Sequence, residues 1–212
     1  MKGLLLKDLY MAAKYCRVYP IIVLVFAAAS IFSDGNIFFL FYPILMAGII
    51  PVTLMSYDEK SRWEVYSGAF PYTRKQLVTV KYGIALLVLG CSVALIAAVQ
   101  GIHLAFSEKA DWLGYALLLA VMLPLGLFPP CILLPVMFRF GVDKGRIVFY
   151  AVIIVVCGAL GALGALDLGT GAAAFLSGLG SGWTIAAVLA AGALLFLGSW
   201  RLSIHFYQKR EL

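Results

Sequence analysis

Long apolar runs are the feature of this chain that most restricts its fold. A helix of about 20 apolar residues crosses the roughly 30 Å of hydrocarbon in a bilayer. Six runs of this kind can be placed in the 212 residues, at 18–32, 37–57, 83–106, 112–138, 147–166 and 183–200. Apolar residues make up 64% of the sequence, compared with about half in soluble domains. We therefore expect an all-α membrane protein with one transmembrane domain over residues 1–212, whose short first helix begins upstream of the apolar run, near Tyr15.

The basic residues indicate which ends of the spans face the cytoplasm, because loops rich in Lys and Arg stay on that side. Of the 16 basic residues, 15 fall in the N-terminal segment, the second and fourth connections and the C-terminal tail, and only Lys109 lies opposite. We predict six spans with both termini in the cytoplasm. The net charge of +6 follows from this distribution and from contact with anionic lipid, so it gives no reason to expect a nucleic-acid partner.

Residues 1–17 alternate apolar and charged side chains before the first long apolar run begins. Lys7 and Lys14 lie two helical turns apart on one side. This pattern predicts an amphipathic helix in the cytoplasmic interface of the membrane, and the alternative is a plain extension of the first span. The charges interrupt any signal-peptide pattern, so we expect the first span to serve as the targeting signal.

The fourth run contains four prolines, and each proline removes a backbone donor and clashes with the preceding helical turn. We expect this helix to be kinked or broken. A broken helix would line a cavity, whereas a kink would be purely architectural. The prolines are Pro124, Pro129, Pro130 and Pro135.

Small residues recur in the fifth run at a spacing that lets two helix backbones approach closely. The partner is either another subunit or a helix of the same chain. The connection 167–182 that follows is rich in Gly and Ala, and it forms either a re-entrant or interfacial helix or a flexible loop. The small residues are Gly158, Gly161, Ala162, Gly164 and Ala165.

The predicted spans carry no Asp, Glu, Lys or Arg, so they lack the charges that ion-coupled transporters keep inside the membrane. Gln100 and His103 share one face of the third run, where we favour hydrogen bonding between helices over a proton relay. The sequence has no catalytic constellation, no metal-ligand cluster and no Walker A motif, so we expect neither enzyme activity nor a cofactor in this chain. We interpret the isolated cysteines as small packing residues: Cys16, Cys91, Cys131 and Cys157.

The segment 58–82 is the one long polar interruption between apolar runs, and it combines charges of both signs with aromatic residues. Its Pro71-Tyr72-Thr73-Arg74 sequence predicts a helix start, after which Arg74, Lys75, Val78 and Lys81 recur at helical spacing. Two short helices around a proline turn would form a rigid knob in the cytoplasm. Aromatic residues and arginine are the types that anchor protein interfaces.

In these residues the chain resembles the ABC-2 type permeases, the membrane subunits of ATP-binding cassette transporters. It is most similar to a group of small permeases that includes exporters of peptide toxins and peptide antibiotics. The resemblance rests on the start Lys2-Gly-Leu-Leu-Leu-Lys-Asp-Leu9, on the six apolar runs, and on Asp58-Glu59-Lys60 followed by Trp63, Tyr66, Pro71, Arg74 and Lys81-Tyr82.

The resemblance implies a non-catalytic subunit in a bacterial plasma membrane, paired with a second permease copy or a paralogue. ATP and Mg²⁺ would bind to a separate cytoplasmic ATPase. The N-terminal helix and the loop would seat against that ATPase, and small residues of the fifth run would pack at the dimer interface. The residues implied in coupling are Lys7, Asp8, Asp58, Glu59, Lys60, Arg62, Trp63, Tyr66, Pro71, Arg74 and Lys75.

Other readings remain open at the sequence level. Asp58, Glu59 and Lys60 would also serve as an ordinary cap and solvated helix end. The whole chain would also suit a membrane immunity or scaffold protein that binds a membrane-active peptide without pumping it, and an intramembrane enzyme is the weakest reading. Spans without charge favour apolar or amphipathic cargo that enters from lipid, and we favour peptide over lipid or hydrophobic drug.

Overall fold

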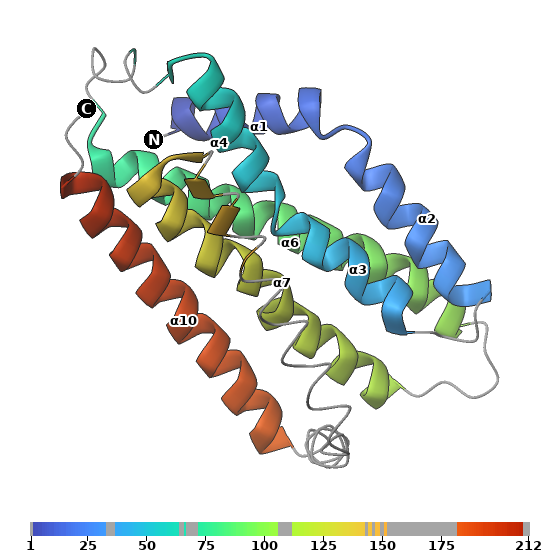
Figure 1. Ribbon diagram of the computed structural model, residues 1–212. Coiled ribbons are helices and arrows are strands. Elements are labelled where there is room, and N and C mark those ends of the chain that lie inside the picture. The colour runs from blue at the N-terminus through green and yellow to red at the C-terminus, as the bar shows by residue number, and fades with distance from the viewer. Residues whose placement is uncertain are drawn as a thin grey trace.

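The computed structural model describes residues 2–32, 37–63, 66, 72–105, 112–142, 144–145, 147–148, 151 and 182–209, and its described elements are all helices. They are α1 (Lys2–Tyr15), α2 (Tyr19–Phe32), α3 (Ile37–Ala47), α4 (Ile50–Lys60), α6 (Arg74–Ala105), α7 (Trp112–Phe140) and α10 (Gly182–Lys209). In Figure 1, α6, α7 and α10 run alongside one another, and α10 packs mainly against α7. The helices α2, α3 and α4 pack on α6.

Four segments are long and apolar enough to cross a membrane: Phe39–Lys60, Arg74–Ala105, Gly114–Phe140 and Ala186–Lys209. The pair α1 and α2 gives a fifth candidate if it is counted as one span. These segments confirm a multi-pass helical protein and coincide with the second, third, fourth and sixth predicted runs. Most of the fifth run, the small residues from Gly158 to Ala165 and nearly all of the connection 167–182 lie outside the described residues.

The first span does not extend upstream as the sequence suggested. The helix α1 ends at Tyr15, the chain turns over residues 16–18, and α2 begins at Tyr19 with an angle of 62° between the two helices. The physical reason is Pro20, which has no N–H group to donate to the carbonyl of Cys16 and is therefore tolerated in the first turn of α2 but not inside one continuous helix. The N-terminal residues therefore form a separate helix and not an extension of the first span.

The second span is interrupted where α3 gives way to α4, at Gly48 and Ile49. A Cβ atom on Gly48 would lie 2.9 Å from Pro129 Cβ and 2.9 Å from Pro130 Cδ of α7. The glycine thus allows the interruption to pack directly on the proline pair. In contrast, α7 continues as one helix through all four of its prolines, which excludes the broken helix among the two expected alternatives, a kink or a break.

The helix α6 has 32 residues and begins nine residues before the predicted span. Its start is a capping box, in which Gln76 N donates to Thr73 Oγ1 (3.3 Å) and Thr73 N donates to Gln76 Oε1 (3.1 Å). The predicted helix start at Arg74 is confirmed. The predicted second short helix is wrong, because residues 74–82 are the first turns of the long α6.

One end of the bundle gathers the start of α6 and the ends of α4, α7 and α10, and α1 packs there against α4 and α6 (Figure 1). We refer to it as the inner end.

Polar contacts deeper in the bundle join its helices. The Tyr82 hydroxyl of α6 lies 2.7 Å from the hydroxyls of Ser199 and Ser203 of α10, and Ser199 donates to Cys131 O of α7 (2.7 Å).

Gln100 donates to Ala27 O of α2 (3.3 Å), which confirms a hydrogen bond between helices at this position. His103 is exposed.

Cys16 and Cys131 are half-buried free thiols, whereas Cys91 is exposed and Cys157 lies outside the described residues. Burial raises the pKa of the Cys16 thiol, as expected for a packing residue.

Candidate functional site

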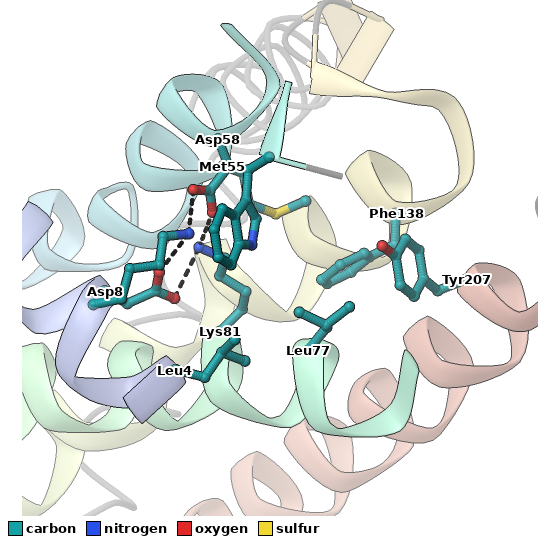
Figure 2. Close-up of a pocket in the computed structure, with 10 residues that line it drawn as sticks. Leu4, Asp8, Met55, Asp58, Leu77, Lys81, Phe138 and Tyr207 are labelled. Carbon is teal, nitrogen blue, oxygen red and sulfur yellow. Dashed lines mark hydrogen bonds and ion pairs between the residues drawn. The ribbon is translucent and has the colours of Figure 1, made fainter. Parts of the chain in front are cut away.

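Four charged side chains from three helices form a closed ring at the inner end. The helix α1 supplies Lys7 and Asp8, α4 supplies Asp58 and α6 supplies Lys81. Each ammonium group is within ion-pair distance of both carboxylates: Lys81 lies 2.8 Å from Asp8 and also pairs with Asp58, and Lys7 lies 3.4 Å from Asp8 and also pairs with Asp58. Figure 2 shows this ring, which we call the charge ring.

Three members of the charge ring are nearly inaccessible to solvent: Asp8 is 1% exposed, Asp58 is 6% exposed and Lys81 is 8% exposed. Two positive and two negative charges give the ring a formal charge of zero. Burying an isolated charge is strongly unfavourable, and removal of one partner from a buried pair typically destabilises a protein by about 3–5 kcal/mol. The ring therefore makes the positions of α1, α4 and α6 depend on one another.

The helical period explains why these charges point inward. On α1, Asp8 follows buried Leu4 by four residues. On α6, Lys81 lies on the face that also buries Val78 and Ala85. Apolar neighbours thus hold each charged side chain against the adjacent helices, where the opposite charges are.

Trp63 covers the charge ring from the loop side. The Lys7 ammonium lies 4.1 Å from the centroid of the indole ring, a cation–π contact. Together with ring members and apolar residues such as Leu77 and Phe138, Trp63 lines a cavity of about 40 Å³ (Figure 2). One water molecule needs a cavity of about 10–15 Å³, so a cavity of about 40 Å³ has room for water. Within the described residues Asp8 Oδ1 accepts no hydrogen bond, so a water could bind there.

Beyond the charge ring, several predicted coupling residues are exposed to solvent. Glu59 Oε2 accepts a hydrogen bond from Val142 N (3.1 Å), which joins the end of α4 to the segment after α7. Arg62 adopts a positive φ of 52° directly before Trp63. The exposed residues, which we call the loop rim, are Glu59, Lys60, Arg62, Tyr66 and Lys75.

Arg74 points away from the loop rim and toward α10. Its guanidinium donates to Tyr207 O (3.1 Å) and Gln208 O (3.0 Å), the carbonyl groups at the end of that helix. A positive charge at a helix C-terminus also interacts favourably with the helix dipole. Arg74 therefore fastens the start of α6 to the end of α10.

The structure thus divides the predicted coupling residues into three groups. Lys7, Asp8 and Asp58 lie in the charge ring with Trp63 over it, the loop rim is exposed, and Arg74 binds α10. Pro71 lies outside the described residues. Within the described residues, no group of three His, Cys, Asp or Glu side chains is placed to hold a metal ion.

Lys81 is a functional residue that was not predicted from the sequence as a partner of the two aspartates. The predicted spans contain no charge, whereas the helices α4 and α6 extend past the predicted limits and include Asp58 and Lys81. A signal was present: opposite charges stand at the adjoining ends of two consecutive apolar runs, and Lys81 lies at helical spacing from apolar residues. Charges at this position in a membrane helix are rare and are expected to be paired.

A family model described as ABC-2 family transporter protein matches residues 3–208. The chain belongs to this family. Neither a curated protein nor a solved structure matches the chain significantly.

ABC-2 family membership identifies the chain as a membrane component of a transporter. Membrane subunits of this family lack an ATPase domain and work with a partner ATPase. It is a multi-pass membrane protein of an ATP-binding cassette transporter.

Proposed function

We propose that this ABC-2 protein is the pathway-forming subunit of an exporter in a bacterial plasma membrane. Two permease subunits, either two copies or a copy and a paralogue, surround the pathway, and a separate cytoplasmic ATPase provides the energy. The observation that supports this proposal most directly is the charge ring, which joins three helices immediately behind an exposed, charged loop.

The loop rim is the part of the inner end that we propose contacts the ATPase. It presents both signs of charge and one large aromatic residue, Tyr66, which is 64% exposed. Arginine and aromatic residues contribute most of the affinity in many protein interfaces. Trp63 is half-buried over Lys7, so its role in this proposal is to brace the loop on the charge ring and not to anchor the ATPase directly.

A displacement of the loop rim by the ATPase would pass through the charge ring into the membrane. Asp58 transmits it to α4, Lys81 to α6, and the pair Lys7 and Asp8 to α1. Because separating any pair would leave a buried charge unpaired, the three helices would move together. This is how a cytoplasmic event can move transmembrane helices without a chemical step in this chain.

The cargo that we propose is an amphipathic peptide that enters from the lipid phase. In the described helices, residues 19–32, 39–57, 83–105, 114–138 and 186–200 contain no Asp, Glu, Lys or Arg. A pathway lined by these helices would offer an apolar surface to the cargo, and charged solutes would lose hydration without compensation.

The test uses the chain coexpressed with the P-loop ATPase that copurifies with it from its native membrane. Lys60→Glu/Arg62→Glu reverses two exposed charges of the loop rim, and Arg201→Glu is the matched control because Arg201 is exposed near the end of α10. We expect the loop variant to reduce ATPase affinity by roughly thirtyfold, the effect of losing about 2 kcal/mol at an interface, and to abolish peptide efflux. Normal copurification and efflux in the loop variant would contradict docking at the loop rim.

The same cells distinguish a pump from a peptide-binding immunity protein. We expect an ATPase variant with its Walker A lysine replaced to remove protection against the exported peptide. Protection that persists with this inactive ATPase would favour the non-pumping alternative.

A further inference from the structure

A second site lies further along α1 than the charge ring, in the angle between α1 and α2. It is a groove of about 210 Å³ with an almost entirely apolar lining, between the bent pair of helices and the middle of α6. Figure 1 shows the bend, where the two helices separate at the 62° turn. We call it the elbow groove.

The elbow groove opens on the outside of the bundle. Its edges include Leu9 of α1, which is 46% exposed, and Leu87 of α6, which is 44% exposed, and Cys91 on α6 is exposed as well. Both α2 and α6 belong to segments that are apolar enough to span the membrane. An apolar groove of this kind suits an acyl chain better than water, because water would lose hydrogen bonds there and the acyl chains of a bilayer would be adjacent.

Arg17 gives the elbow groove a charged mouth. It lies in the turn between α1 and α2, lines the groove and is exposed. Lys14, also exposed, precedes it by about one helical turn. In the described part of the chain, no carboxylate lies within ion-pair distance of either side chain. Arginine is well suited to bind phosphate oxygens through several donors.

We propose that the elbow groove is a binding site for one anionic phospholipid, with an acyl chain in the groove and the phosphate group on Arg17. The turn lies where the charged α1 meets the apolar α2, which is the depth of the headgroups. Charge complementarity selects the anionic lipid over zwitterionic lipid. Bound in this way, the lipid holds the C-terminal end of α1 while the charge ring holds its middle.

The experiment uses the purified chain in phosphatidylcholine vesicles that contain a trace of either phosphatidylglycerol or phosphatidylcholine with a photoreactive diazirine in the acyl chain. After irradiation, the adducts are mapped by mass spectrometry to Leu87 and Cys91 in the groove. Leu194 and Leu195 of α10, which are 70% and 63% exposed, serve as a reference for unselective contact with lipid. No ATPase takes part, so the result does not depend on the proposed function.

Relative to the α10 reference, we expect phosphatidylglycerol to label the groove about fivefold more than phosphatidylcholine, the preference that one basic residue gives at a membrane surface. Arg17→Gln should remove this preference, and Arg17→Lys should keep it. The control Arg201→Gln removes an exposed charge from α10 and should change nothing. Ala13→Trp, which adds bulk at an exposed position of the groove, should lower groove labelling by both lipids.

Three results would overturn the proposal. The first is equal groove labelling by the two lipids in the parent chain, and the second is an unchanged preference in Arg17→Gln. The third is groove labelling by neither lipid while α10 is labelled normally, which would assign the groove to another occupant such as the cargo.

Discussion

At the scale of single residues, the charge ring shows that a membrane protein can bury charges without leaving any of them unpaired. Each carboxylate of the ring contacts two ammonium groups, so removing one residue affects two ion pairs. Removing one positive and one negative residue together keeps the ring neutral. The effects of such substitutions should therefore not be additive.

Lys81→Met and Asp58→Asn test this coupling. Each single substitution leaves an uncompensated buried charge and should destabilise the protein by about 3–5 kcal/mol. The double variant retains the neutral pair Lys7 and Asp8, so it should lose clearly less than the sum of the two single losses. Thermal unfolding of the purified protein in detergent measures these differences.

Lys75→Met is the control for those variants, since Lys75 lies on the same helix but is exposed. It should unfold like the parent protein. Strictly additive losses in the Lys81 and Asp58 series would show that the ring does not act as a unit.

The cover over the ring gives a second residue-scale prediction. Trp63→Ala removes the aromatic face above the Lys7 ammonium, a contact worth about 0.5–2 kcal/mol, and opens the small cavity to water. We expect a lower unfolding temperature and lower abundance in the membrane. Trp63→Phe keeps an aromatic face, so it should recover most of the unfolding temperature and most of the membrane abundance. Tyr66→Ala is the control, because Tyr66 is exposed and its loss should leave stability unchanged. Equal stability of Trp63→Ala and the parent would contradict a bracing role.

At the scale of helices, the apolar centres of the spans could be predicted from the sequence, but several of their ends and bends could not. Hydropathy places a boundary at the first charge, whereas α4 and α6 continue because Asp58 and Lys81 find partners on other helices. The prolines predicted a kink or a break in α7, whereas the helix is interrupted in the neighbouring segment at Gly48, which packs against them. The sequence does not show this contact, so it could not indicate which of the two segments is interrupted. The coupling residues of α1 were suggested by resemblance, and their pairing with Lys81 is visible only after folding.

The close contact between Gly48 and α7 can be tested by adding a single methyl group at Gly48. Gly48→Ala would place a Cβ atom 2.9 Å from Pro129 Cβ and from Pro130 Cδ, so the rigid rings must move. We expect a loss of about 1–3 kcal/mol of stability, as for overpacking in a core. Gly90→Ala is the matched control on α6, because its Cβ atom would meet no atom within 4 Å. If the two variants unfolded at the same temperature, the close approach of the two segments would be contradicted.

At the scale of the whole molecule, the structure brings to one end the segments that carry most of the positive charge. Contacts between Arg74 and the end of α10, and between Glu59 and Val142, show that the ends of α4, α7 and α10 and the start of α6 share this end. In the sequence, 15 of the 16 basic residues fall in the N-terminal segment, the second and fourth connections and the C-terminal tail, which adjoin these helix ends, so the positive-inside rule predicts that this end faces the cytoplasm. The docking proposal depends on this orientation, because the ATPase is cytoplasmic.

Cysteine labelling in intact cells tests the orientation. In a background in which the four native cysteines are replaced by alanine, Ser61→Cys places a thiol on the exposed loop beside the charge ring, and Ser177→Cys places one in the connection 167–182. A membrane-impermeant thiol reagent should modify Ser177→Cys in intact cells and Ser61→Cys only after permeabilisation, because the reagent cannot cross the bilayer to the positively charged side. The cysteine-free parent controls for unspecific reaction. The reverse pattern would place the loop rim and the charge ring outside the cell, where no cytoplasmic ATPase could reach them, and would therefore exclude the coupling proposal together with the predicted orientation.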